Sequence, residues 1–384
     1  MPSRDPWLDN AKMGLVTLVV VGHLLAYLPA DGPGGKLYDV VYLWHMPAFV
    51  LITGYLSRNF AFTRRRMWQL FSTLLVPYLF FEGALAWFRT VVGGEKLRDL
   101  WIDPHFPVWY LLAVVAWRLL TPLFRSLPPL VGIGLAVAIA MAGSFLTGDW
   151  TRYLDLPRLS GFLPFFVIGL NITPQRLQLV RGRLQTGLAL GAVAVIVVLG
   201  LNLDRWAARG YLYQRPIELL DDATGTFLLT RVAVLVVGLV GTAAWLALIS
   251  RRGGWFSRMG AATMVVYLVH GFAVKGLDYA GFGDWVEPRP LLGTAAAVVL
   301  GVAIALVLAC TPVRRPLEPV VDPFATAEEA VGDAVQVAVV VSEHEAGGGD
   351  VAAGIAAVEE ATTGGVGEPG KGEAPAPSSG AVSG

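Results

Sequence analysis

Four ionisable side chains stand inside long apolar segments of this 384-residue chain: His23, His45, Glu82 and His270. Ionisable groups are costly in hydrocarbon, so inside membrane helices they indicate a functional site. An imidazole titrates near neutral pH and can take a proton from a hydroxyl, and a carboxylate beside it can fix its tautomer. The alternative is structural, because histidines also hydrogen-bond neighbouring helices within bundles.

The spacing between Lys12 and His23 places both residues on one face of a helix. The eleven steps between them turn a helix through about 1100°, three turns plus about 20°, and advance it by about 16 Å. This face would carry a cation at the membrane edge and an imidazole deep inside. Asp9 precedes Lys12 by three residues, a spacing that favours an ion pair.

His45 is followed by Met46 and Pro47. A proline inside a helix frees a backbone carbonyl and bends the helix, so the sequence predicts a kink beside this histidine. The kink could open a cavity, or it could be a purely structural bend.

Basic residues gather near the other end of these segments: Lys12, Arg58, Arg64, Arg65 and Arg66. Guanidinium groups suit the phosphates of an acyl-CoA donor. Lys and Arg also orient membrane helices simply by their charge, which is the plainer interpretation. Trp109 and Tyr110 could stack on a sugar, or could be ordinary interface anchors. The same alternatives hold for the aromatic and acidic side chains of the long outer segment 204–228, which contains Tyr211, Tyr213, Arg215, Glu218, Asp221 and Asp222.

The composition is that of a polytopic membrane protein. Hydrophobic residues make up 55% of the chain and charged residues 15%, and the formal net charge is zero. Apolar runs of spanning length predict an all-α bundle of about ten transmembrane helices. The runs cover about 12–28, 39–56, 68–91, 107–121, 130–147, 158–171, 186–203, 229–248, 261–275 and 291–311, of which 158–171 and 261–275 are short.

The charges between these runs predict the orientation. With the amino terminus inside, the inner connections hold arginines and no acids, and the outer connections hold most of the acids. This asymmetry favours a plasma-membrane protein with both termini in the cytoplasm. On this topology His23, His45, Glu82 and His270 all lie within about 7–14 Å of the outer surface.

Two regions divide the chain. Residues 1–321 form the transmembrane domain, and residues 322–384 form a tail with eleven acidic residues against one lysine. The tail is rich in Gly, Ala, Glu, Pro and Ser, so we expect a disordered, acidic cytoplasmic segment.

The amino-terminal cluster resembles the acyltransferase-3 family of integral-membrane O-acyltransferases, in the branch similar to fucose 4-O-acetylases. The resemblance rests on Leu8-Asp9, on Lys12 followed by ten residues and His23, on His45-Met46-Pro47, and on Gly54-Tyr55. It extends more loosely to about residue 315, through His105-Phe106-Pro107-Val108-Trp109-Tyr110 and Tyr267-Leu268-Val269-His270.

The resemblance implies catalysis by His23 and His45. His23 would be either a general base or a transient acyl carrier. Lys12, Arg58 and the arginines 64–66 would bind acetyl-CoA as a co-substrate, with no tightly bound cofactor and no metal. The family usually has two arginines three residues apart here, whereas this chain has three in succession, which leaves open which of them meets the donor. Asp9, Glu82, Trp109 and His270 would support the site.

The hypothesis is therefore an enzyme that moves an acyl group, most simply acetyl, onto a hydroxyl of a cell-surface or lipid-linked carbohydrate. The alternative is a proton-coupled transporter or flippase with a His/Glu relay, although the sequence shows no repeat symmetry of the kind that transporters have. No phosphate-binding loop, dinucleotide fingerprint, HExxH motif or nucleophile elbow occurs, and nothing indicates nucleic-acid binding.

Overall fold

The computed structural model describes residues 5–97, 101, 107–180, 182–220 and 226–324. The chain divides into the unit Met1–Phe324 and the unit Ala325–Gly384, and only the first is described here. Most of the acidic tail, and also His105, Asp221 and Asp222, lie outside the described residues, so the expected disorder of the tail stays a prediction.

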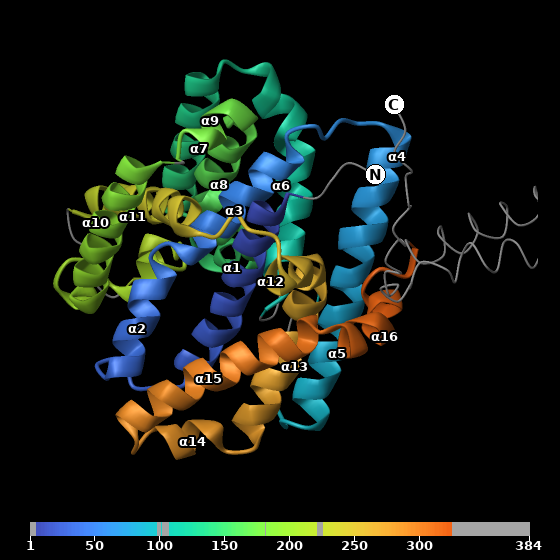
Figure 1. Cartoon of the computed structure of the whole chain (residues 1–384), viewed down its shortest axis with the longest axis vertical. Helices are drawn as coiled ribbons and strands as arrows, with labels where there is room; N and C mark the ends of the chain where they lie inside the picture. The colour runs from blue at the N-terminus through green and yellow to red at the C-terminus, as the bar shows by residue number, and fades with distance from the viewer. Residues whose placement is uncertain (1–4, 98–100, 102–106, 181, 221–225, 325–384) are drawn as a thin grey trace, which may run out of the picture. The chain divides into compact units, whose positions relative to one another are not determined.

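The described part of the chain is helical, joined by short 3-10 turns and loops (Figure 1). Its helices are α1 (Pro6–Leu25), α2 (Pro33–Tyr42), α3 (His45–Ser57), α4 (Arg64–Leu70), α5 (Val76–Val91), α6 (Trp109–Ser126), α7 (Pro129–Gly143), α8 (Leu156–Asn171), α9 (Pro174–Gln178), α10 (Arg183–Leu201), α11 (Phe227–Leu248), α12 (Trp255–Met259), α13 (Thr263–Tyr279), α14 (Phe282–Val286), α15 (Pro290–Ala309) and α16 (Thr311–Val321). A π-helical turn, Phe71–Leu75, joins α4 to α5.

The prediction of an all-α polytopic bundle is confirmed. Within the described residues, eight helical segments are long and apolar enough to cross a membrane. Both of the runs that were short in sequence, 158–171 and 261–275, fall within such segments, Tyr153–Asn171 and Trp255–Tyr279. The other two predicted spans coincide with α6 and with α7, which is apolar but only 15 residues long.

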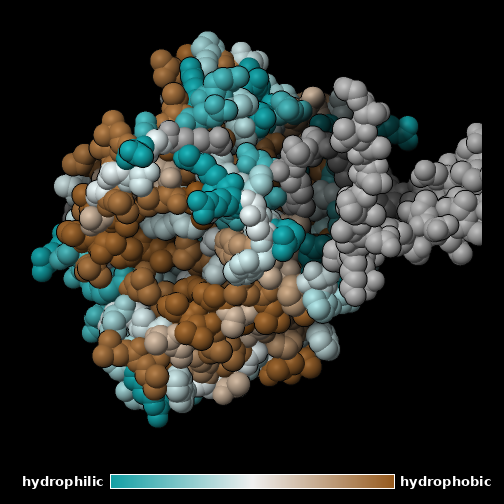
Figure 2. Space-filling model, in the orientation of Figure 1, coloured by the Kyte–Doolittle hydropathy of each residue, from teal (hydrophilic) through white to brown (hydrophobic). Residues whose placement is uncertain are grey.

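The outer surface of the bundle is apolar where it would meet lipid. In α10 only 17% of the span is buried, and in α15 only 22%, so leucines and valines such as Leu188 and Val299 are exposed. Figure 2 shows hydrophobic side chains over much of the visible face, with hydrophilic ones gathered mainly toward its ends. Helices this apolar with so little protein cover are stable in hydrocarbon rather than in water.

Figure 1 places α9, which lies in a predicted inner connection, toward one end of the bundle, and α14, which lies in a predicted outer connection, at the opposite end. The short helix α12, also in a predicted inner connection, is drawn between these two ends. The orientation of the chain in the membrane stays a prediction.

Close backbone approach fixes the position of α3 against α8. A Cβ on Gly54 would lie 2.1 Å from the carbonyl oxygen of Phe166, and a Cβ on Gly169 would lie 2.1 Å from that of Leu51. Both residues must therefore be glycine for these two helices to touch. This contact holds the helix that begins at His45 against α8, which brings its first turn to the candidate site.

Candidate active site

A cavity of about 610 Å³ opens among α1, α2, α3, α6, α8 and the segment 212–219. Residues singled out in the sequence as candidates line it, both among the histidines, His23 and His45, and among the possible sugar-binding residues, Trp109, Tyr110, Tyr213 and Arg215. His23 is only partly buried, whereas His45 and His270 are 1% and 0% exposed. Among the three histidines, His23 therefore offers a bound molecule the most accessible side chain.

The predicted kink at Pro47 is a complete break between α2 and α3. Proline lacks an N–H and its ring collides with the carbonyl four residues earlier, that of Leu43, so the helix stops at Leu43 and Trp44. His45 is the first residue of α3, and its ring nitrogen Nδ1 lies 2.9 Å from the carbonyl oxygen of Val41. A carbonyl only accepts, so Nδ1 carries the hydrogen and Nε2 keeps its lone pair.

His23 is held by groups from two other helices. The hydroxyl of Tyr42 lies 3.4 Å from His23 Nδ1, and the ring of His270 stacks on the His23 ring at 5.4 Å between centroids. His270 Nδ1 is itself hydrogen-bonded to the carbonyls of Val266 and Tyr267, at 3.1 and 2.7 Å. These contacts fix the plane and the direction of the His23 imidazole.

Gly22 allows Tyr42 to come this close. A Cβ at residue 22 would lie 2.7 Å from the ring of Tyr42, so any larger residue would displace the tyrosine from its neighbour His23. The same tyrosine packs edge-on against His45, with 4.5 Å between ring centroids. Tyr42 therefore lies between the two histidines and contacts both.

Aromatic side chains continue from this pair along the cavity. Tyr38 stacks on Tyr42, and its hydroxyl is hydrogen-bonded to that of Tyr213. On another side, Trp109 stacks on Phe162. Aromatic faces with hydroxyl groups between them suit a ligand that has apolar faces and polar edges, as a sugar has.

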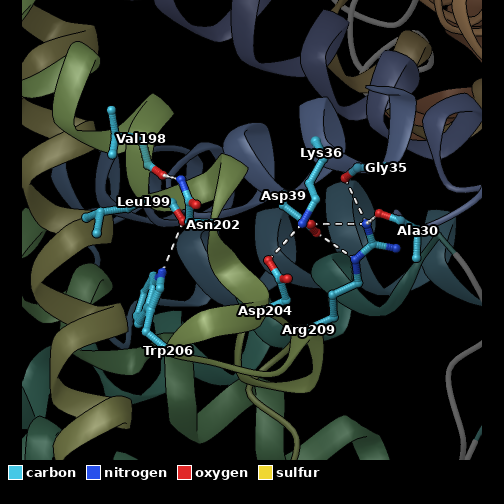
Figure 3. A network of polar contacts seen from close by, with 10 residues as sticks. All are labelled: Ala30, Gly35, Lys36, Asp39, Val198, Leu199, Asn202, Asp204, Trp206 and Arg209. Atoms are coloured by element: carbon cyan, nitrogen blue, oxygen red, sulfur yellow. Dashed lines mark hydrogen bonds and ion pairs between the residues drawn. The ribbon is translucent and has the colours of Figure 1, made fainter. Parts of the chain in front are cut away.

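The loop that carries Tyr213 is tied to α2 by Arg209. The guanidinium of Arg209 binds both carboxylate oxygens of Asp39, with Nε–Oδ1 at 2.6 Å, and donates to the carbonyls of Ala30 and Gly35 (Figure 3). Lys36 adds a contact of 2.8 Å to Asp204 in the same network. Two ion pairs thus fasten one end of the loop over the cavity.

The other end of the loop is held by a buried arginine of α11. Arg231 is 1% exposed, and its side chain donates to Gln214 Oε1 at 3.0 Å and to the carbonyl of Arg215. Gln214 has a φ of 60°, a left-handed conformation that is unfavourable for glutamine. Strain of this kind persists where the surroundings enforce it. Here the enforced turn presents Tyr213 and Arg215 to the cavity.

The predicted donor-binding cations lie away from this cavity. Lys12 forms the expected ion pair with Asp9, at 2.8 Å, near the start of α1. Arg58 follows the last residue of α3 and donates to the carbonyl of Tyr55 at 2.8 Å. The three consecutive arginines begin α4. Glu82 is fully buried in α5 and does not line the cavity.

Sequence reasoning missed several cavity residues. Tyr38 and Tyr42 are four residues apart in α2, and this spacing on one helix face could have indicated them. Arg158, beside a proline at the start of α8, gave no local signal. It reaches the cavity only because α8 packs against α3.

The fold and the site define a class of protein, a polytopic membrane protein with histidines and aromatic side chains around a cavity in its helix bundle. The comparison with known families gives the chemistry, since residues 5–310 match the acyltransferase domain of the acyltransferase-3 family. The chain belongs to this family and is an acyltransferase.

Two curated relatives are similar over most of their length. The chain is 27% identical over 336 residues to nodulation protein NolL of Mesorhizobium japonicum. The aligned region covers 79% of this chain and 85% of the relative. The chain is 26% identical over 331 residues to nodulation protein NolL of Sinorhizobium fredii, covering 79% and 88%. No solved structure matches the chain significantly.

Proposed function

We propose that this acyltransferase transfers an acetyl group from acetyl-CoA to a hydroxyl of a cell-surface or lipid-linked carbohydrate. The observation that carries the proposal is the partly buried His23, which faces the aromatic cavity while Tyr42 and His270 fix its ring. An accessible imidazole held in one orientation is what a general base requires.

In the reaction, the acceptor hydroxyl would lose its proton to His23 as its oxygen attacks the thioester carbonyl carbon. The new C–O bond replaces the C–S bond, and the thiolate of CoA leaves and takes up the proton. His45, whose Nε2 keeps a lone pair, would orient the acceptor hydroxyl by accepting a hydrogen bond. The aromatic side chains would bind the sugar faces.

The donor would bind away from the cavity, where Lys12 of α1, paired with Asp9, and Arg58 at the end of α3 supply positive charge. Arg118 of α6 would join this set, because its Nε donates to Ser57 Oγ at 3.2 Å, next to Arg58 in the chain. The phosphates of CoA would lie among these cations, and the long pantetheine arm would carry the thioester along the bundle toward His23.

The proposed orientation places these cations in the cytoplasm, where acyl-CoA is made, and the aromatic cavity toward the outer face of the plasma membrane. The arginine-rich inner connections support this orientation. Both termini would then be cytoplasmic.

The test is acetyl-CoA binding and slow hydrolysis by protein in lipid nanodiscs, with His23→Ala, Arg58→Ala and the exposed control Lys96→Ala. His23→Ala should keep donor binding and lower turnover about 100-fold or more, the range expected for a lost general base. Arg58→Ala should weaken binding about tenfold, the scale of one charge-assisted hydrogen bond. Turnover in His23→Ala equal to that of Lys96→Ala would refute the assignment.

A further inference from the structure

The cavity that holds His23 is also strongly cationic. Among the residues that the structure describes, its lining includes three arginines, Arg152, Arg158 and Arg215, and one carboxylate, that of Asp155. With neutral histidines the formal charge of the lining is therefore +2. A narrow cleft with charges of one sign concentrates ligands of the opposite charge, because the field is focused by its low-dielectric walls.

Arg158 stands inside the cavity between two aromatic rings. Its guanidinium carbon lies 5.4 Å from the centre of the Trp109 ring and 5.9 Å from that of Tyr213. Its ion pair with Asp155 uses one nitrogen, with Nη1 at 2.7 Å from Asp155 Oδ2. A guanidinium has five N–H donors, so this contact leaves donors of Arg158 for a second anion.

The conformation of Asp155 is part of this arrangement. Leu154 and Asp155 have φ values of 53° and 51°, left-handed conformations that are uncommon outside glycine. The turn they make precedes α8 directly and places the Asp155 carboxylate against Arg158, three residues later. The carboxylate thereby holds the guanidinium at the cavity wall.

Arg152 and Arg215 stand at the edge of the same cavity and are exposed. Arg152 pairs with Asp149 at 3.0 Å, and both side chains are more than half exposed. Arg215 lies 5.6 Å from the ring of Tyr213. Burial raises the pKa of the Tyr213 phenol, while the charges of Arg209, Arg158 and Arg215 act in the opposite direction. The positive groups therefore surround one wall of the cavity.

We infer that the acceptor carries an oxyanion, a carboxylate or a phosphate, near the hydroxyl that is acylated, and that Arg158 binds it with help from Arg152 and Arg215. This inference rests on the proposed acyl transfer at His23. A neutral sugar would need only the aromatic faces and hydroxyls, whereas fork-shaped donors match the oxygens of carboxylate and phosphate groups.

The experiment measures binding of three matched sugars, glucose, glucuronate and glucose 1-phosphate, to the full chain in nanodiscs. At least one charged sugar should bind about tenfold more tightly than glucose, and this preference should shrink as salt is added. The charged sugar that binds more tightly distinguishes a carboxylate from a phosphate. Equal binding of all three sugars, or no detectable binding of the charged ones, overturns the inference.

The variants assign the preference to residues. Arg158→Gln should lose most of the tenfold preference, while Arg289→Gln, at an exposed arginine that does not line the cavity, should keep it. If Arg158→Gln does not fold, the exposed double variant Arg152→Gln/Arg215→Gln must show the loss instead. An unchanged preference in the variants overturns the inference.

Wild-type acetyl-CoA hydrolysis, measured on the same samples, separates the two proposals. Hydrolysis without any preference for charged sugars leaves acyl transfer standing and refutes the anionic acceptor. A preference for charged sugars without acetyl-CoA hydrolysis refutes acetyl transfer from CoA and leaves an anion-binding cavity.

Discussion

Replacing Gly54 by alanine should loosen the contact between α3 and α8 and destabilise the protein more than an alanine substitution at an exposed glycine does. The added Cβ would lie 2.1 Å from the Phe166 carbonyl oxygen, whereas Cβ atoms essentially never come within 3.0 Å of another heavy atom. The helices would therefore have to separate locally by about 0.9 Å, the difference between these two distances. Both atoms belong to helix backbones, so no flexible side chain can move aside.

The expected cost is about 3 kcal/mol, the upper end of the range for overpacking a well-packed interior. The assay is thermal unfolding of detergent-purified protein, in which Gly54→Ala should melt several degrees below the wild type. The matched control is Gly134→Ala in α7, where a Cβ meets nothing within 4 Å. Alanine is the better helix former, so this control should melt at or above the wild-type temperature. Equal melting of Gly54→Ala and Gly134→Ala would refute the packing argument.

Three further changes test the site and its supports. Tyr42→Phe removes the hydroxyl near His23, and loss of about 1 kcal/mol of hydrogen bonding should slow acetyl-CoA turnover about fivefold without changing donor affinity. Arg209→Ala leaves the buried Asp39 carboxylate without its guanidinium, so the protein should lose about 3 kcal/mol of stability in thermal unfolding, and Asp39→Asn added to it should restore part. Burial disfavours the charged form of the Glu95 carboxyl and by itself would raise its pKa. Hydrogen bonds from arginine, tyrosine and lysine side chains outweigh this effect and lower the pKa from 4.5 to about 2. Its stabilising contribution is therefore complete above pH 4.5 and is lost as the pH falls toward about 2, and Glu95→Gln should flatten this part of a stability–pH curve.

The sequence predicted the helices well because membrane spans follow from length and apolarity alone. It placed a helix at each of the ten predicted runs, but three of the helical segments begin six residues earlier than predicted, at Pro6, Pro33 and Trp255. Helix α1 begins at Pro6 because Asp5 caps it, accepting from the Trp7 N–H at 3.0 Å, and proline is favoured in a first turn. Asp9 and Lys12 therefore lie inside the helix.

The site was predicted only in part, for a physical reason. His23 and His45 carry a local signal, because each is an ionisable group in an apolar run. Arg158 and Gln214 carry none, because their positions depend on which helices meet and on a strained turn that a buried arginine enforces. Residue spacing along the chain does not predict tertiary contacts of this kind. The roles of His23, His45 and the donor cations remain predictions for the assays above.

The break between α2 and α3 links Pro47 to the tautomer of His45. The interruption leaves the Val41 carbonyl to receive the Trp44 N–H and the ring of His45 in place of a regular helical ladder. The same oxygen that ends one helix thus determines which nitrogen of the imidazole holds the hydrogen. A residue that interrupts the helix is thereby linked to the tautomer of a neighbouring imidazole through a single carbonyl oxygen.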